Sequence, residues 1–273
     1  MEKFKIKEKY DINDLIRLVR VLRDPADGCP WDKVQTHESI RKNLIEETYE
    51  AADAIDKKDK TLLCEELGDV MLQVALHSEI ERQSGGFDID DVATGICEKL
   101  VLRHPHIFSD VVANDSDTVL TNWEAIKRTE KSQKTGTDSV RDVPLALPAL
   151  ARSQKVQKRA GYVGFDYPNV QMAVDSMHSE TDELSEALRD GTNVEEELGD
   201  LLFSAVNVAR LSGLDAEQSL DRACNKFVKR FEIVEQLADA RQIDMKTADI
   251  HTLNALWDEA KQTFGADASE KMK

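Results

Sequence analysis

The sequence is poor in the residues that build turn-rich, disulfide-bonded or membrane-spanning proteins. Its 273 residues include 12 glycines, 6 prolines and 4 cysteines, and only 5% are aromatic. So few glycines and prolines argue against a turn-rich β protein and favour a helical one. No apolar run approaches the roughly 20 residues that a membrane helix needs. We therefore expect no membrane partner.

Positive charge is also scarce. The chain has 53 acidic and 36 basic residues, which gives a formal net charge of −17. This charge repels a polyanion, and no stripe of lysine and arginine offsets it, so a nucleic-acid polymer is excluded as a partner. The scattered cysteines form no CxxC pair, and the first residues lack the apolar core of a signal peptide. These features predict a cytoplasmic protein.

An internal repeat divides the chain. The tetrapeptide Glu-Leu-Gly-Asp occurs at residues 66–69 and again at 197–200. The same order of matches continues on both sides: Trp31-Asp32 with Phe165-Asp166, residues 46–50 with 179–183, Lys99 and Arg103 with Lys226 and Arg230, and residues 123–127 with 257–261. Collinear matches at nearly constant spacing indicate a duplication.

The two copies define the expected domains. Apolar residues recur at helical spacing in both copies, and strand-like alternation is almost absent, which predicts an all-α protein. Polar residues and prolines between the copies are typical of a connector. We expect a first module at residues 1–130, a linker at 131–148 and a second module at 149–273.

Acidic residues at helical spacing mark a candidate metal site in each copy. At 100° per residue, Glu47 and Glu50 share one flank of a helix, and Glu66 and Asp69 share one flank of the next. Two antiparallel helices bring such flanks together, and a divalent cation offsets the repulsion between the charges. The second copy provides the equivalent set: Glu180, Glu183, Glu197 and Asp200.

The donor atoms predict the cation. Carboxylate oxygens favour Mg²⁺, with Mn²⁺ as a possible substitute, whereas zinc sites recruit histidine or cysteine. A di-iron bundle is disfavoured because no Glu-x-x-His occurs in the chain. Gly68 and Gly199 lie inside these helices, where glycine costs about 1 kcal/mol relative to alanine. We expect a close approach of helices beside the metal to explain that cost.

Several of these motifs resemble the MazG family of nucleoside triphosphate pyrophosphohydrolases in its two-repeat form. Glu46, Glu47 and Glu50 match the EExxE signature of the family, and Glu66 and Asp69 match its ExxD signature. Residues 29–33, 103–106 and 163–166 match further motifs. The resemblance implies tandem helical bundles, usually in a dimer, that cleave nucleoside triphosphates to monophosphate and pyrophosphate.

The resemblance also assigns roles. It implies that the eight residues of the two carboxylate sets bind metal, and that Glu46, Glu50 and Glu183 serve catalysis. The residues that it assigns to substrate binding are Lys99, Arg103, Ser179, Lys226, Arg230, Trp257 and Lys261. Lysine and arginine neutralise phosphate oxygens, and tryptophan offers a flat surface for a base.

The second copy departs from the signature at one position. Ser179 stands where the first copy has Glu46, so the second copy lacks that candidate base. We leave both modules as candidates and favour the second, which combines Lys226, Arg230, Lys261 and Trp257. Two alternatives remain open. One is a narrower pyrophosphatase for dCTP, dUTP or phosphoribosyl-ATP, and the other is a metal-binding interaction module or nucleotide sensor without turnover.

Overall fold

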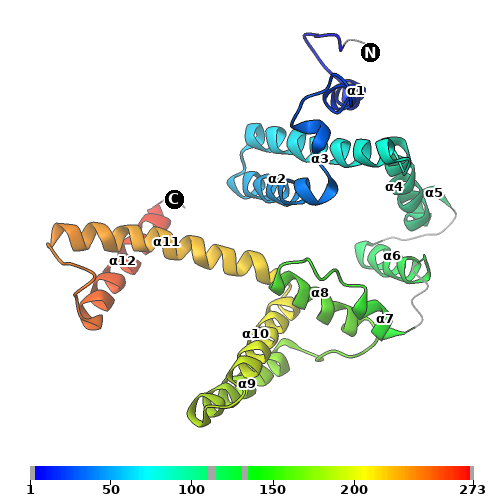
Figure 1. The fold of residues 1–273 in the computed structure, drawn as a ribbon. Coiled ribbons are helices and arrows are strands. Elements are labelled where there is room, and N and C mark those ends of the chain that lie inside the picture. Colours follow the sequence, from blue (N-terminus) through cyan, green and yellow to red (C-terminus); the bar gives the residue numbers. More distant parts are fainter. Residues whose placement is uncertain (1–3, 110–114, 131–134, 271–273) are drawn as a thin grey trace. The chain divides into compact units, whose positions relative to one another are not determined.

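The computed structural model of the protein describes residues 4–109, 115–130 and 135–270. Every regular element in these ranges is a helix (Figure 1), which confirms the all-α prediction. In chain order they are α1 (Ile12–Leu22), a short 3-10 helix (Asp32–Val34), α2 (His37–Lys57), α3 (Lys60–Ser84), α4 (Ile89–Arg103), α5 (Pro105–Phe108), α6 (Ser116–Glu130), α7 (Gly136–Arg141), α8 (Ala149–Gly161), α9 (Val170–Asp190), α10 (Val194–Leu211), α11 (Ala216–Ala240) and α12 (Ile250–Glu270). None of the described helices is long and apolar enough to cross a membrane.

The chain divides into two compact units. The first is Met1–Lys127 and the second is Arg128–Lys273, and we call them the first and second module from here on. Part of the predicted linker forms α7, which packs on α8. Arg159 of α8 is buried and donates a hydrogen bond to the carbonyl oxygen of Ser139 at 2.9 Å. These contacts fix α7 to the second module.

An antiparallel pair of helices, α2 and α3, is the centre of the first module. Thr36 and Ser39 form a capping box that begins α2, and Lys58 ends it in the left-handed conformation. Asp59 then caps the first turn of α3, so a two-residue connection reverses the chain. The apolar core joins α1, α2 and α3 through Val19, Ile40, Ala75 and Leu76. The core therefore sets how α2 lies against α3.

The second module contains an equivalent pair, α9 and α10. Asn169 caps the start of α9, and Gly191 ends it with a positive φ of 71°, which glycine adopts without strain. Helix α8 packs on α10. A second pair, α11 and α12, has its own core of Val234, Ala238, Leu256 and Ala260.

Several helices expose apolar side chains, among them α4 and α11. Within the first module, α4 exposes Ile96 and Leu100 at 50% and 41% of their surface. Within the second, α11 exposes Phe227 and Val228, each at 54%. Ile96 and Leu100 are four residues apart and share one face of α4, and exposed apolar surface of this kind is typical of an interaction site.

Candidate functional site

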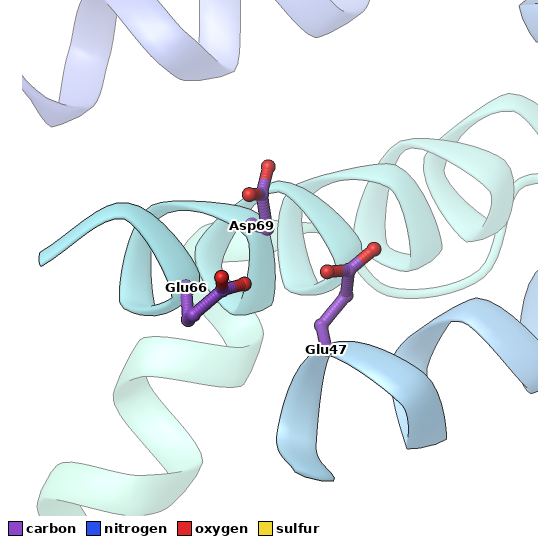
Figure 2. A group of neighbouring side chains, drawn as sticks. All are labelled: Glu47, Glu66 and Asp69. Carbon is purple, nitrogen blue, oxygen red and sulfur yellow. The ribbon is translucent and has the colours of Figure 1, made fainter. Parts of the chain in front are cut away.

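The first carboxylate site lies where α2 crosses the beginning of α3. Glu47 comes from α2, and Glu66 and Asp69 come from one flank of α3 (Figure 2). One carboxylate oxygen of each residue lies within 4.8 Å of those of the other two. The predicted helical spacing thus brings these three side chains together, as expected from the antiparallel pairing.

Electrostatic interactions place Glu50 beside the same three residues. The pKa of Glu47 is raised, first by partial desolvation and then by the charges of Asp69 and Glu50. The pKa of Glu66 is raised, again first by desolvation and then by Glu50 and Glu65. Both shifts mean that the ionised forms are disfavoured, first by desolvation and then by repulsion between the carboxylates. A bound cation removes this cost.

The second module repeats the arrangement on α9 and α10. Carboxylate oxygens of Glu180, Glu183 and Glu197 lie within 4.8 Å of one another. The pKa of Glu180 is raised by desolvation, then by Glu183 and Asp200, so Asp200 also lies near the cluster. The pKa of Glu197 is raised as well, first by desolvation and then by Glu183. All four predicted carboxylates therefore act on one another here too.

The donor set fits a hard divalent cation. Only carboxylate oxygens converge in each cluster, and these are the ligands that Mg²⁺ and Mn²⁺ prefer. The carboxylates are half-buried or exposed, so open coordination positions remain for water and for phosphate oxygens. Magnesium keeps several such ligands because it gives up water reluctantly.

Glu46 and Ser179 differ in their surroundings as well as in their chemistry. Glu46 is exposed on α2. The hydroxyl of Ser179 donates a hydrogen bond to Oε1 of Glu183 at 3.1 Å. Ser179 thus supports a member of the second cluster, while Glu46 brings a further negative charge to the helix that carries Glu47 and Glu50.

Of the residues predicted to bind substrate, Ser179 lies on α9 beside the second cluster, and the others lie on other helices. In the first module Lys99 and Arg103 are on α4, and the Arg103 guanidinium lies 5.5 Å from the ring centre of Trp123. In the second module Lys226 and Arg230 are on α11. Lys261 of α12 pairs with Asp258 at 2.6 Å. The carboxylates and the basic residues of each module therefore come from separate parts of the helical framework.

Trp257 contributes to a core. Its ring packs against the cluster of Val234, Ala238, Leu256 and Ala260 and lies 5.1 Å from the ring of Phe227. It remains half-buried rather than fully buried, so part of the ring stays accessible. Trp257 can therefore pack in the core and still offer part of its ring to a nucleobase.

We expected a close approach between helices at Gly68 and Gly199. This prediction is wrong in the described part of the chain. A Cβ atom added at either glycine would meet nothing within 4 Å. The two glycines leave open space next to the carboxylates, since Gly68 directly precedes Asp69 and Gly199 directly precedes Asp200.

Two interactions had no clear signal in the sequence. Asp166, identified only through the repeat and a motif match, forms an ion pair with Arg210 in which Nη1 of Arg210 lies 2.9 Å from Oδ2. Hydrogen bonding to Arg210 is the main cause that lowers the pKa of Asp166. In the first module His37 and His77, forty residues apart, meet through their ring nitrogens. Only the packing of α2 on α3 reveals that contact.

Fold and site together define an all-α protein with a duplicated helical pair, each pair holding a cluster of carboxylates suited to a divalent cation. Residues 35–108 and 170–234 match the MazG nucleotide pyrophosphohydrolase domain. The chain therefore belongs to the MazG nucleotide pyrophosphohydrolase family, as its motifs indicated.

Full-length relatives share this organisation. The chain is 42% identical over 255 residues to the nucleoside triphosphate pyrophosphohydrolase of Escherichia coli (strain K12), covering 92% of this chain and 97% of the relative. It is 40% identical over 248 residues to the nucleoside triphosphate pyrophosphohydrolase/pyrophosphatase MazG of Thermotoga maritima, covering 91% and 94% of the two chains. The similarity extends over both modules.

Proposed function

We propose that this protein hydrolyses nucleoside triphosphates to nucleoside monophosphate and pyrophosphate, with Mg²⁺ held by the carboxylate clusters. The observation that carries the proposal is the convergence of four carboxylates on each helical pair, with the pKa of two of them raised in each module. The names of the two relatives support the same reaction. Removal of aberrant nucleotides from a cytoplasmic pool is the physiological role that we propose for it.

The carboxylates of each cluster would hold the cation. Glu47, Glu66 and Asp69 would bind Mg²⁺ in the first module, with Glu50 beside them. When bound, the ion masks the negative charge of the phosphates and of the departing pyrophosphate. The cluster thereby accepts an anionic substrate in a chain whose net charge is −17.

A water molecule attacks phosphorus, and a carboxylate of the cluster takes its proton. In the first module Glu46 or Glu50 can act as this base, since both lie on α2 next to the metal ligands. In the second module Glu183 is the candidate, and Ser179 orients it. The bond between the α-phosphorus and the bridging oxygen breaks, and that oxygen leaves with pyrophosphate.

The basic residues would neutralise the remaining negative charge of the substrate phosphates. Lys226 and Arg230 are four residues apart on α11 and therefore share one helix face. Their positive charges suit phosphate oxygens, and the accessible part of the Trp257 ring suits a nucleobase. We favour the second module for turnover because it carries this set together with Lys261.

We also propose a homodimer. Exposed apolar side chains on α4 and α11 are the support, together with the dimeric state that the family resemblance implies. A second copy packed on these helices would cover Ile96, Leu100, Phe227 and Val228. Light scattering on the purified chain is expected to give twice the monomer mass of 30.7 kDa.

Product analysis tests the reaction. The purified protein is incubated with each common triphosphate, with and without Mg²⁺, and the products are separated by anion exchange. Monophosphate and pyrophosphate that form only with Mg²⁺ support the proposal. Diphosphate and phosphate would show a different cleavage site. The double variant Glu50→Ala, Glu183→Ala serves as the control for contaminating phosphatases.

One observation favours a second candidate for part of the chain. Because Ser179 is a much weaker base than glutamate, the second module could bind nucleotide without turnover and act as a sensor. Tight binding of nucleotide without product formation, measured by calorimetry in the Glu50→Ala variant, would support this role.

A further inference from the structure

Two histidines and a glutamate form a polar contact at the far end of the α2/α3 pair from the first carboxylate cluster. His37 is the first residue of α2, and His77 and Glu81 lie on α3. Nδ1 of His37 lies 2.6 Å from Nδ1 of His77. Nε2 of His37 lies 2.8 Å from Oε1 of Glu81. His37 therefore has a polar partner at each of its ring nitrogens.

The geometry shows a hydrogen bond rather than ring stacking. The two rings are within 3° of parallel, and their centres are 5.0 Å apart. Stacked rings keep their atoms about 3.5 Å or more apart, whereas the Nδ1 atoms here are 2.6 Å apart. The rings thus lie edge to edge in nearly one plane, with the two nitrogens facing each other.

The same geometry argues against a zinc ion between the rings. Zinc binds imidazole nitrogen at about 2.0–2.1 Å with tetrahedral angles, so two ligand nitrogens would be about 3.4 Å apart. The observed separation of 2.6 Å is shorter than that by a wide margin. A proton on the line between the nitrogens fits the distance.

The donor and acceptor properties of His37, His77 and Glu81 determine how many protons the contact holds. The carboxylate of Glu81 can only accept, so Nε2 of His37 carries a proton. Two lone pairs facing each other at this distance would repel, and so would two N–H groups, so the Nδ1 pair holds a single proton. The pKa of His77 is consistent with a single shared proton. It is lowered first by partial burial and then by the charge of His37, so a second proton on the pair is disfavoured.

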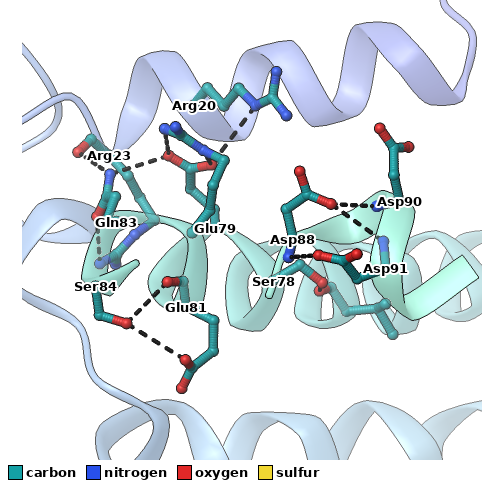
Figure 3. A network of polar contacts seen from close by, with 12 residues as sticks. Arg20, Arg23, Ser78, Glu79, Glu81, Gln83, Ser84, Asp88, Asp90 and Asp91 are labelled. Atoms are coloured by element: carbon teal, nitrogen blue, oxygen red, sulfur yellow. Dashed lines mark hydrogen bonds and ion pairs between the residues drawn. The ribbon is translucent and has the colours of Figure 1, made fainter. Parts of the chain in front are cut away.

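Other charged groups lie around the contact. Glu38 follows His37 on α2, accepts hydrogen bonds at the start of its helix and also interacts electrostatically with His37. From α1, Arg20 approaches Glu79, and Arg23 donates to Gln83 at 3.1 Å. Figure 3 shows this network on the α1 side of α3, with Glu81 and Ser84 on the other side. Asp88, which caps α4, interacts with Arg82.

The second module lacks the contact. Counted from the matched carboxylates, Val170 stands at the position of His37 and is also the first residue of its helix. Val208 stands at the position of His77. Valine side chains do not titrate, so the second module supplies an internal reference.

We propose that His37 and His77 share one proton and form a latch that ties the start of α2 to α3 in the first module, and that this latch opens when the second imidazole becomes protonated. Glu81 is the positioning residue that presents Nδ1 of His37 to His77. The latch is independent of catalysis, because none of its members belongs to the carboxylate cluster.

Nuclear magnetic resonance on the full chain with ¹⁵N-labelled histidine tests the shared proton directly. A scalar coupling between the two Nδ1 nuclei at pH 7.5 is expected, because such couplings cross an N–H···N hydrogen bond. The coupling is expected to be lost as the pH is lowered, because protonation of the second imidazole removes the lone pair that accepts the shared proton. Absence of the coupling at pH 7.5 would overturn the proposal.

Hydrogen exchange tests the opening. Between pH 7.5 and 5.0, protection of the amides of residues 41–44, relative to the equivalent residues 174–177, is expected to fall, because protonation of the second imidazole breaks the hydrogen bond that holds the start of α2. The double variant His37→Val, His77→Val copies the second module and should lose this response. His251→Gln removes an exposed histidine elsewhere and should keep it. An unchanged response in the double variant would contradict the latch.

Discussion

The hydroxyl of Ser179 donates a hydrogen bond to Oε1 of Glu183, one helical turn further along α9, at 3.1 Å. In the first module the same two positions are Glu46 and Glu50, which cannot make this bond while both are ionised. The two modules therefore differ at this position. The first has a carboxylate that could serve as a base, and the second has a hydroxyl that orients a neighbouring carboxylate.

Replacing Ser179 by alanine should weaken metal binding in the second module. An exposed hydrogen bond contributes about 1 kcal/mol, so we expect Mg²⁺ affinity to fall about fivefold. Titration calorimetry measures this loss. Ser185→Ala is the matched control, because its hydroxyl donates to the Thr181 carbonyl oxygen of the same helix at 2.8 Å. An equal loss in both variants would show that the bond to Glu183 has no special role.

Single substitutions should locate turnover. Glu183→Ala removes a carboxylate from the second cluster and Glu50→Ala removes the matching one from the first. Charge stabilisation by a bound metal is worth several kcal/mol, so we expect Glu183→Ala to lower kcat at least about 100-fold. Glu50→Ala should retain most activity. The reverse pattern in a steady-state assay would assign turnover to the first module.

Removing one crowded charge should stabilise the metal-free protein. The raised pKa of Glu66 means that its ionised form is disfavoured in the folded state, so this group lowers stability at neutral pH and the penalty fades as pH falls through its raised pKa. Glu66→Gln should therefore raise Tm at pH 7 without metal.

The same variant should respond less to metal and to acid. Mg²⁺ is expected to raise the Tm of the wild type more than that of Glu66→Gln, because the variant has lost a ligand. Below pH 5 the difference between the metal-free proteins should shrink. Glu98→Gln, an exposed glutamate on α4, is the control. A Glu66→Gln variant with lower metal-free Tm at pH 7 would contradict the crowding argument.

Gly68→Ala should stabilise the metal-free chain. A Cβ atom there meets nothing within 4 Å, and alanine in a helix interior is favoured over glycine by about 0.5–1 kcal/mol. Urea unfolding measures this gain. Gly28→Ala should lose stability instead, since its Cβ would overlap the carbonyl oxygen of Asp24. If Gly68→Ala also weakens nucleotide binding, the glycine keeps that space open for the ligand.

The sequence alone predicted the helical class, the duplication and the membership of both carboxylate sets. These features depend on periodicity, because residues three or four apart must share a helix flank and an antiparallel partner must face it. Glu47, Glu66 and Asp69 follow this logic, and the structure brings them together.

Only the tertiary structure decided which distant side chains touch. The contact between His37 and His77 depends on how the core residues Ile40 and Leu76 set α2 against α3, and no local pattern encodes that relation. The packing of α7 on α8 likewise depends on Arg159, whose burial cannot be read from its neighbours in the chain. Helical periodicity is a local property of the sequence, whereas the fit between helices is a property of the folded whole.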